Sequence, residues 1–322
     1  MILGKNGEQG MSVSKFISAG ILLASGVPCL AHDLRGLGDL TSSLNEQVNP
    51  SQIYQLADQQ ADPEKRYVYA LLLRWKVGQT LKACFFDGTD TEKAYVIQIV
   101  KEMLIKTKVN LFVDFGNESS PRACSEPGPR ADMRFSFAQG CCRAYVGRIA
   151  HYPKPEVQSG PSIFLQGVLA YDARKARQTV IHEVFHAWGL EHEHQSPDSS
   201  CATEFKKDKV MEDTGWSESD YVTNMKTLDR DHRSYKYSSY DNASIMKYFF
   251  DETELKNGKQ SVCYSEENYD PSPRDLEGLQ DAYPANPPAV SSERSRALIS
   301  TIPSAAISSA ARELATQLNS QP

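Results

Sequence analysis

Hydrophobic and polar positions along the chain follow strand-like and helix-like patterns in turn from Leu81 onward. Between residues 91 and 106, apolar side chains recur at intervals of three or four, which predicts an amphipathic helix. Short runs rich in Val, Leu, Ile and Phe lie on both sides of this helix and indicate strands. We expect strands at residues 81–86, 109–115, 131–137 and 162–165.

Three more helices are expected further along the chain. The first covers about residues 179–190. The pattern then weakens, and a loop-rich stretch contains one short helix at about residues 218–225. The last helix opens at Ser272 and runs to about Tyr283, because serine is a good N-cap and Pro273 suits the first helical position.

The start of the chain has the features of a secretory signal. Residues 11–31 combine the positive charge of Lys15, a short apolar core and a small-residue cleavage site that ends at Ala31. The apolar core is too short to span a bilayer comfortably, and no other segment is long and apolar enough to do so. A buried N-terminal helix is the alternative. We expect residues 1–31 to direct secretion.

The two segments that flank the central region are polar or low in complexity. Residues 32–66 end at the dibasic pair Lys65-Arg66, and they form either a solvated linker or a propeptide whose removal leaves Tyr67 at the N-terminus. At the other end, residues 284–322 are rich in Pro, Ser and Ala, which predicts a disordered tail, with a weak helix at residues 305–318.

Charge and cysteine content limit the possible partners. The formal net charge is -6 and no long basic run occurs, so we expect no nucleic-acid partner. An even number of cysteines in a secreted chain indicates disulfides, and zinc ligation by cysteine lacks the support of a CxxC pair. Fifteen pairings stay open, although two adjacent cysteines are not expected to bond to each other. After loss of Cys29, the cysteines are Cys84, Cys124, Cys141, Cys142, Cys201 and Cys263.

One motif in the helix at 179–190 indicates a metal site. His182 and His186 are four residues apart and therefore share one helix face. Gly189 allows the chain to leave the helix in a left-handed conformation, so that His192 returns as a third nitrogen ligand. Three histidines with an open fourth position describe catalytic zinc, because structural zinc usually has four protein ligands.

The length of this motif argues against coincidence. A bare H-E-x-x-H also arises in an amphipathic helix with solvated histidines. The long form H-E-x-x-H-x-x-G-x-x-H fixes five positions that agree with one geometry. Glu183, beside the first histidine, is placed to hold a water molecule. The sequence therefore predicts one zinc ion per chain.

The motif and its flanks, residues 182–197, resemble the metzincin metalloproteases and most closely the astacin family. Residues 244–248, Ser-Ile-Met-Lys-Tyr, resemble the family's Met-turn S-I-M-H-Y, with Lys247 in place of histidine. Residues 140–147, Gly-Cys-Cys-Arg-Ala-Tyr-Val-Gly, are similar to the segment G-C-W-S-Y-V-G before the substrate-edge strand. The resemblance implies an α+β metzincin-like catalytic domain at residues 67–283. It has a mixed, mostly parallel sheet, an active-site helix and a loop-rich C-terminal subdomain.

The resemblance also implies roles for single residues. His182, His186 and His192 bind zinc, and Glu183 is the general base. Tyr248 is a further, displaceable zinc ligand whose phenol also stabilises the oxyanion, rather than an ordinary core tyrosine. Met246 packs beneath the metal.

Three further residues concern activation and specificity. Glu193 follows the third histidine, and the resemblance implies that it pairs with the ammonium group of Tyr67 after propeptide removal. Asp39 matches the last position of the F-x-G-D latency motif, of which this chain keeps Gly38 and Asp39. Lys247 adds a charge near the cleft and leaves substrate preference open.

These observations predict a secreted zinc endopeptidase that acts on protein or peptide substrates. A secreted, catalytically inactive binding module that keeps the zinc helix is the alternative. A disulfide-stapled structural protein with a chance motif is a third interpretation, and it predicts no stoichiometric zinc. The oligomeric state is not set by the sequence.

Overall fold

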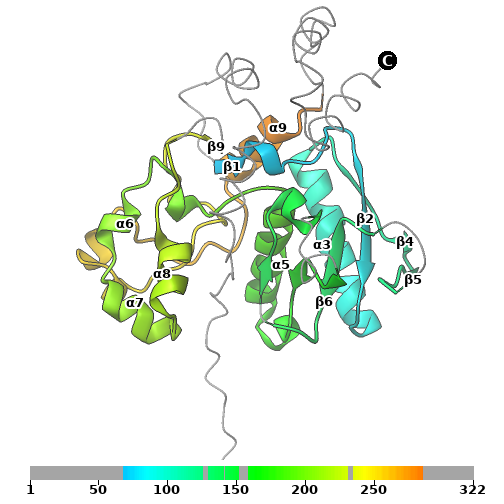
Figure 1. Ribbon diagram of the computed structural model, residues 1–322, viewed down its shortest axis with the longest axis horizontal. Coiled ribbons are helices and arrows are strands. Elements are labelled where there is room, and N and C mark those ends of the chain that lie inside the picture. Colours follow the sequence, from blue (N-terminus) through cyan, green and yellow to red (C-terminus); the bar gives the residue numbers. More distant parts are fainter. Residues whose placement is uncertain (1–67, 126–129, 141, 152–158, 231–234, 286–322) are drawn as a thin grey trace, which may run out of the picture.

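The computed structural model describes residues 68–125, 130–140, 142–151, 159–230 and 235–285. The expected signal, the expected propeptide with Asp39 and Lys65-Arg66, residue Tyr67 and nearly all of the expected tail lie outside these residues. Figure 1 shows two lobes beside each other. The sheet lobe contains a five-stranded sheet with helices α3 (Asp90–Thr107) and α5 (Ala173–Ala187). The C-terminal lobe contains short helices.

The sheet has the strand order β3-β2-β6-β8-β7. Its strands are β2 (Thr80–Phe85), β3 (Phe112–Asp114), β6 (Met133–Ser136), β7 (Arg143–Ala144) and β8 (Ile163–Phe164). Four of them are parallel, and β7 runs antiparallel to β8 at one edge. The predicted mixed, mostly parallel sheet is therefore confirmed.

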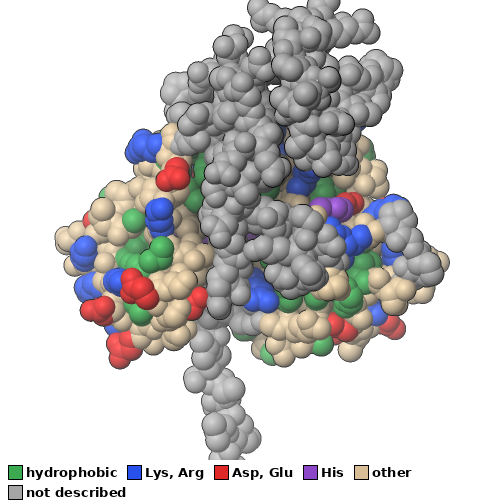
Figure 2. Space-filling model, viewed as in Figure 1, with side chains coloured by type: hydrophobic (Ala, Val, Ile, Leu, Met, Phe, Trp, Pro, Cys, Tyr) green, Lys and Arg blue, Asp and Glu red, His purple; other side chains and the backbone are tan. Residues whose placement is uncertain are grey.

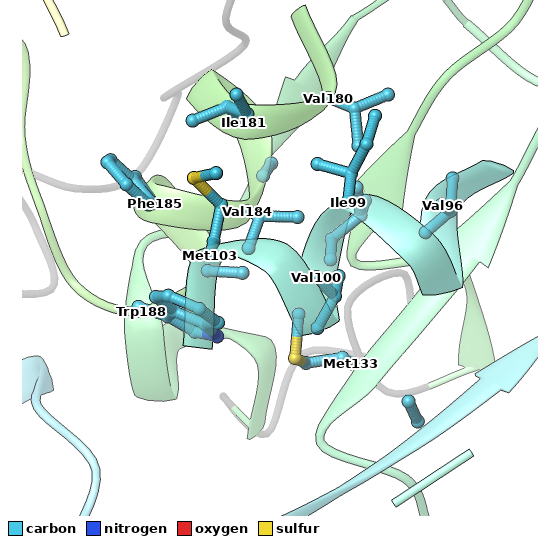
Figure 3. Packing of buried hydrophobic residues seen from close by; sticks show 14 of the residues in the cluster. Val96, Ile99, Val100, Met103, Met133, Val180, Ile181, Val184, Phe185 and Trp188 are labelled. Atoms are coloured by element: carbon cyan, nitrogen blue, oxygen red, sulfur yellow. The ribbon is translucent and has the colours of Figure 1, made fainter. Parts of the chain in front are cut away.

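Helices α3 and α5 pack against each other and against the sheet. Thr89 and Glu92 form a capping box at the start of α3, and Lys108 ends this helix in a left-handed conformation. Figure 3 shows the apolar side chains at the contact. They are Val96, Ile99, Val100 and Met103 of α3, Val180, Ile181, Val184 and Phe185 of α5, and the neighbouring Met133 and Trp188. Each buried side chain of this size contributes about 1.5–3 kcal/mol.

Three of the four predicted strands are shorter than the sequence indicated, whereas β2 has the predicted length and begins one residue earlier. The run at 109–115 forms a strand only from Phe112, because Lys108 has turned the chain and the Asn110 N–H donates to the carbonyl of Tyr283 instead. A small hairpin, β4 (Gly116–Asn117) and β5 (Ser120–Pro121), follows it.

The sequence also did not predict a pair of strands that lies outside the main sheet. The antiparallel pair of β1 (Val68–Ala70) and β9 (Tyr235–Tyr237) joins two distant segments, with Val68 opposite Tyr237. Each strand is too short to produce a clear alternation in the sequence.

The C-terminal lobe is built from three short helices, α6 (Cys201–Glu204), α7 (Lys207–Thr214) and α8 (Glu218–Met225). Helix α8 coincides with the predicted helix, and Ser217 and Asp220 form its capping box. The other two were not predicted, because α6 has only four residues and α7 buries a single side chain, Val210, so neither has a clear apolar period. The lobe has its own apolar core of Phe205, Val210, Trp216, Tyr248, Phe250 and neighbouring side chains.

The last helix, α9 (Pro273–Ala282), begins after the predicted N-cap Ser272, whose hydroxyl accepts two backbone N–H groups. Short 3-10 helices connect the larger elements, at Leu71–Leu73, Gly147–His151, Val168–Ala170, Glu193–Gln195, Glu252–Glu254 and Gly258–Gln260. Among the described residues, no helix is both long and apolar enough to cross a bilayer.

Two disulfides join described cysteines, one in each lobe. Cys84 bonds to Cys124 and Cys201 bonds to Cys263, which confirms disulfides for four of the six cysteines. Cys142 is buried with its sulfur 4.0 Å from the Tyr171 hydroxyl, and Cys141 lies outside the described residues. On the face shown in Figure 2, basic and acidic side chains are interspersed over the C-terminal lobe and do not gather into a basic patch.

Candidate metal centre and active site

Helix α5 carries the first two histidines of the motif. Asp172 caps its N-terminus, because the side chain accepts the N–H groups of Arg174 and Lys175 at 3.0 and 3.1 Å. The helix therefore begins at Ala173, earlier than the predicted residue 179, and both histidines lie well inside it.

The chain leaves α5 through Gly189, whose φ of +101° confirms the left-handed conformation expected there. The helix ends at Ala187, short of the predicted residue 190. The Trp75 indole donates to the Ala187 carbonyl at 2.7 Å, and the Tyr283 hydroxyl donates to the Trp188 carbonyl at 2.6 Å. Two distant side chains thus satisfy carbonyl groups that have no partner within the helix.

Strand β1 fixes the direction of the segment after Gly189. Leu190 forms a bridge with Tyr69, and the N–H of Glu191 donates to the Val68 carbonyl at 3.1 Å. This contact holds the returning chain beside α5. His192 is consequently brought to the same point as the two helical histidines.

The three predicted ligands converge. The Nε2 atom of His186 lies 3.1 Å from Nε2 of His182 and 3.0 Å from Nε2 of His192. Imidazole nitrogens that share one tetrahedral zinc ion at about 2.0–2.1 Å are roughly 3.3 Å apart. These three histidines are also the cluster of described residues that fits a metal ion. The donor set therefore fits zinc.

Hydrogen bonds of the Nδ1 atoms explain why the Nε2 atoms of His182 and His186 face the centre of the cluster. Nδ1 of His182 lies 2.8 Å from the Ile245 carbonyl oxygen, and Nδ1 of His186 lies 2.8 Å from the Leu190 carbonyl oxygen. A carbonyl only accepts, so each Nδ1 carries the proton and each Nε2 offers its lone pair to the centre.

Burial keeps the ligands neutral. It lowers the pKa of His182 to about 4 and holds the pKa of His186 well below its ordinary value, where the other histidines add to the effect. A neutral imidazole is the form that binds metal. The site is thus prepared for a cation at neutral pH.

Glu183 is buried beside the cluster, with 2% of its surface exposed. Its Oε2 atom has no hydrogen-bond partner among the described residues. Burial raises the pKa of this carboxyl well above the ordinary value, and the positive charge of Arg143 opposes the shift. Arg143 belongs to edge strand β7, and its guanidinium stacks 4.2 Å above the Phe164 ring. A buried carboxylate oxygen without a partner is suited to proton transfer.

Tyr248 lies against the histidine cluster. Its ring centroid is 4.3 Å from that of His192 and 6.2 Å from that of His182, and its hydroxyl is 3.5 Å from Oδ1 of Asn224. Burial raises the pKa of the phenol well above its ordinary value. Lys247, expected to add charge near the cleft, is buried instead, and its Nζ donates to the Tyr248 carbonyl at 2.8 Å.

The turn that carries Met246 is held by α9. Asp275 accepts the Ser244 hydroxyl at 2.6 Å and the Ile245 N–H at 2.9 Å. Met246 is buried in the core of the sheet lobe, and its carbonyl accepts the N–H of Glu193 at 3.1 Å. The Ile245 carbonyl is the acceptor for His182. Helix α9 thus helps to set the first ligand.

The structure also adds residues that the sequence reasoning missed. Gln195 accepts from Nδ1 of His192, and His194 and Asn224 lie behind Tyr248. A polar side chain three residues after the third histidine was a possible signal for Gln195. Any solvated glutamine gives the same pattern, and only the carbonyl groups of Thr223 and Lys226, far along the chain, distinguish Gln195 from one.

Comparisons with known proteins support this site. The family model of Astacin, a peptidase family, matches residues 122–271, which include the motif and the Met-turn. This central region is thus similar to the astacin family. The resemblance inferred from the sequence is confirmed, and so is the α+β fold of this astacin domain with its mostly parallel sheet.

One solved structure supports the fold with a TM-score above 0.5. A structure of myroilysin matches with a TM-score of 0.54 and 25% identity, over 68% of this chain and 99% of that chain. A second myroilysin structure gives 0.43 and 26%, over 66% and 86%. High choriolytic enzyme 1, a hatching enzyme zinc-protease from Oryzias latipes (medaka fish), gives 0.38 and 13%, over 65% and 93%. No curated protein matches the chain in sequence.

Proposed function

We propose that the chain is a secreted zinc endopeptidase in which Glu183 is the general base. The observation that carries this proposal is the convergence of three histidine Nε2 atoms next to a buried Glu183 oxygen that has no hydrogen-bond partner in the described part of the chain. The astacin-family match supports the same reaction class, a zinc metalloprotease that acts on proteins.

His182, His186 and His192 would hold the zinc ion. When bound, zinc polarises the scissile carbonyl and lowers the pKa of water, so that a nucleophile forms near neutral pH. Glu183 accepts the proton of this water at Oε2 and later delivers it to the leaving amine. The burial that raises the pKa of Glu183 makes it a stronger base than a solvated carboxylate.

Tyr248 stabilises the negative charge that develops on the carbonyl oxygen of the substrate. Because burial raises its pKa, the phenol stays protonated and donates a hydrogen bond to the developing oxyanion. With zinc bound and no substrate present, Tyr248 would serve as a displaceable further ligand. Substrate lies extended and antiparallel to edge strand β7, as peptides do when they add to an exposed strand.

Secretion and activation belong to the same proposal. The two disulfides, Cys84–Cys124 and Cys201–Cys263, are typical of an oxidising compartment. Residues 32–66 act as a propeptide, with Asp39 as the latency residue. After cleavage behind Arg66, the Tyr67 ammonium pairs with Glu193. Two observations support this pairing. Strand β1 starts at Val68, directly after Tyr67, and Glu193 is buried, with its Oε1 atom accepting the Asp241 N–H at 2.9 Å.

The test compares casein cleavage by the secreted, N-terminally processed protein and by its Glu183→Ala variant. Loss of a general base lowers the rate by about 10²–10⁴-fold. We expect cleavage by the first protein alone, abolished by a chelator, with one zinc per chain in both. If processed protein carrying one zinc cleaves neither casein nor a broad peptide library, the proposal is wrong and a binding module takes its place.

A further inference from the structure

The third histidine differs from the first two in the group that holds its outer nitrogen. His182 and His186 donate from Nδ1 to backbone carbonyls, which no substitution removes. His192 faces a side chain instead, with Nδ1 3.0 Å from Oε1 of Gln195. Among these three Nδ1 contacts between described residues, the contact of His192 is the one made by a side chain, which a substitution can replace.

The amide of Gln195 has its orientation fixed from the other side. Its Nε2 donates to the carbonyls of Thr223 and Lys226 at 2.9 and 3.0 Å. An amide nitrogen carries two hydrogens, and both are used here. The oxygen must therefore face His192, and because this oxygen only accepts, the proton of His192 lies on Nδ1.

These two carbonyls lie at the end of helix α8, where intrahelical partners run out. More contacts join this turn to the segment after the motif. The Leu228 N–H donates to the Gln195 carbonyl at 2.8 Å, and Nε2 of His194 lies 2.9 Å from the Asn224 carbonyl oxygen. Gln195 is buried, with 2% of its surface exposed. Several hydrogen bonds thus tie the end of α8, in the C-terminal lobe, to the segment that follows His192.

We propose that Gln195 is a positioning residue of the metal centre. It holds His192 in the tautomer that directs the Nε2 lone pair at the metal. Because Gln195 also binds the end of α8, the position of His192 depends on the position of that helix. This inference rests on the proposed zinc site. Outer-shell partners of metal-binding histidines affect metal affinity by about 10–100-fold. We therefore expect Gln195 to affect zinc affinity more than it affects folding.

The test measures zinc affinity by competition with a chelator for the full chain and for Gln195→Met, which keeps the length and removes the acceptor. The matched control is Gln280→Met, since Gln280 also donates an amide N–H to a carbonyl, that of Thr107, but lies on α9 away from the cluster. We expect zinc binding to weaken about 10–100-fold in the first variant and to change less than about twofold in the control. Equal affinity of Gln195→Met and the unmodified chain would overturn the inference.

A measurement on the unmodified chain covers the case in which Gln195→Met does not fold. Nitrogen NMR of the metal-free protein labelled at histidine reports which ring nitrogen carries the proton. We expect His192 protonated at Nδ1, and protonation at Nε2 contradicts the inference. If the unmodified chain binds no zinc, the proposed function fails, whereas the tautomer of His192 still tests Gln195.

Discussion

The two lobes hold the residues of the metal centre by different means. His182 and His186 lie on α5, whose side chains pack in the apolar core of the sheet lobe. His192 and Tyr248 lie on irregular segments, and contacts with β1, α8 and α9 set their positions. Apolar packing is non-directional and fixes a helix as a body, whereas hydrogen bonds fix single groups. We therefore expect substitutions around His182 and His186 to affect stability most, and substitutions around His192 and Tyr248 to affect zinc binding most.

The largest effect on stability is expected in the core of the sheet lobe. Phe185 is fully buried on α5, so Phe185→Ala leaves a cavity and costs about 3–5 kcal/mol. Chemical denaturation measures the free energy of unfolding. The control is Ile105→Ala, because Ile105 is 77% exposed and its truncation costs less than about 0.5 kcal/mol. Similar losses in the two variants would contradict the packing described.

The disulfides sharpen the comparison. Replacement of Cys201 and Cys263 by serine opens the C-terminal lobe and costs about 2–5 kcal/mol. We expect zinc affinity to fall with it, because α8 holds His192 through Gln195. The same replacement of Cys84 and Cys124 costs a comparable amount, since the bridged loops are similar in length, yet leaves zinc affinity unchanged. Equal loss of zinc affinity in both double variants would show that the lobes do not differ in this way.

The hydrogen-bonded half is also expected to respond to pH. Burial raises the pKa of Asp275 to about 6, above the value of about 3.9 for an unfolded aspartate. A carboxyl with a raised folded-state pKa adds stability below the unfolded pKa, and this contribution is lost as pH rises through the folded pKa. Asp275 therefore makes the free energy of unfolding fall by about 3 kcal/mol between roughly pH 4 and 6.

Asp275→Asn tests this assignment, because asparagine does not titrate. The variant is expected to be less stable overall, since Ser244 and Ile245 lose a carboxylate acceptor. Its decline in stability between roughly pH 4 and 6 should be smaller than that of the unmodified chain. An identical slope in both proteins would mean that another group titrates.

The smallest effect concerns the start of α5. Asp172→Ala removes the N-cap and costs about 1 kcal/mol, with the helix and the zinc affinity otherwise preserved. Thermal melting with and without zinc measures both quantities. A large loss of zinc affinity in this variant would show that the N-cap, and not apolar packing against the core, determines the position of α5.

The sequence predicted the parts of this molecule that rest on local chemistry. The helix with His182 and His186, the left-handed Gly189 and the Ser272 cap each follow from neighbouring residues. Strands β1 and β9 are set by a partner far along the chain, and three residues carry too little pattern. Gln195 belongs to the same class, because its role depends on carbonyls at the end of α8.

The measurement that tests the central claim most directly is metal removal and replacement. The processed protein is stripped of metal with a chelator, its casein cleavage is measured, and zinc is added back in steps. We expect no cleavage without metal and full recovery at one zinc per chain, the stoichiometry that His182, His186 and His192 set. Cleavage by metal-free protein, or one tightly bound zinc without recovery of cleavage, would contradict the account.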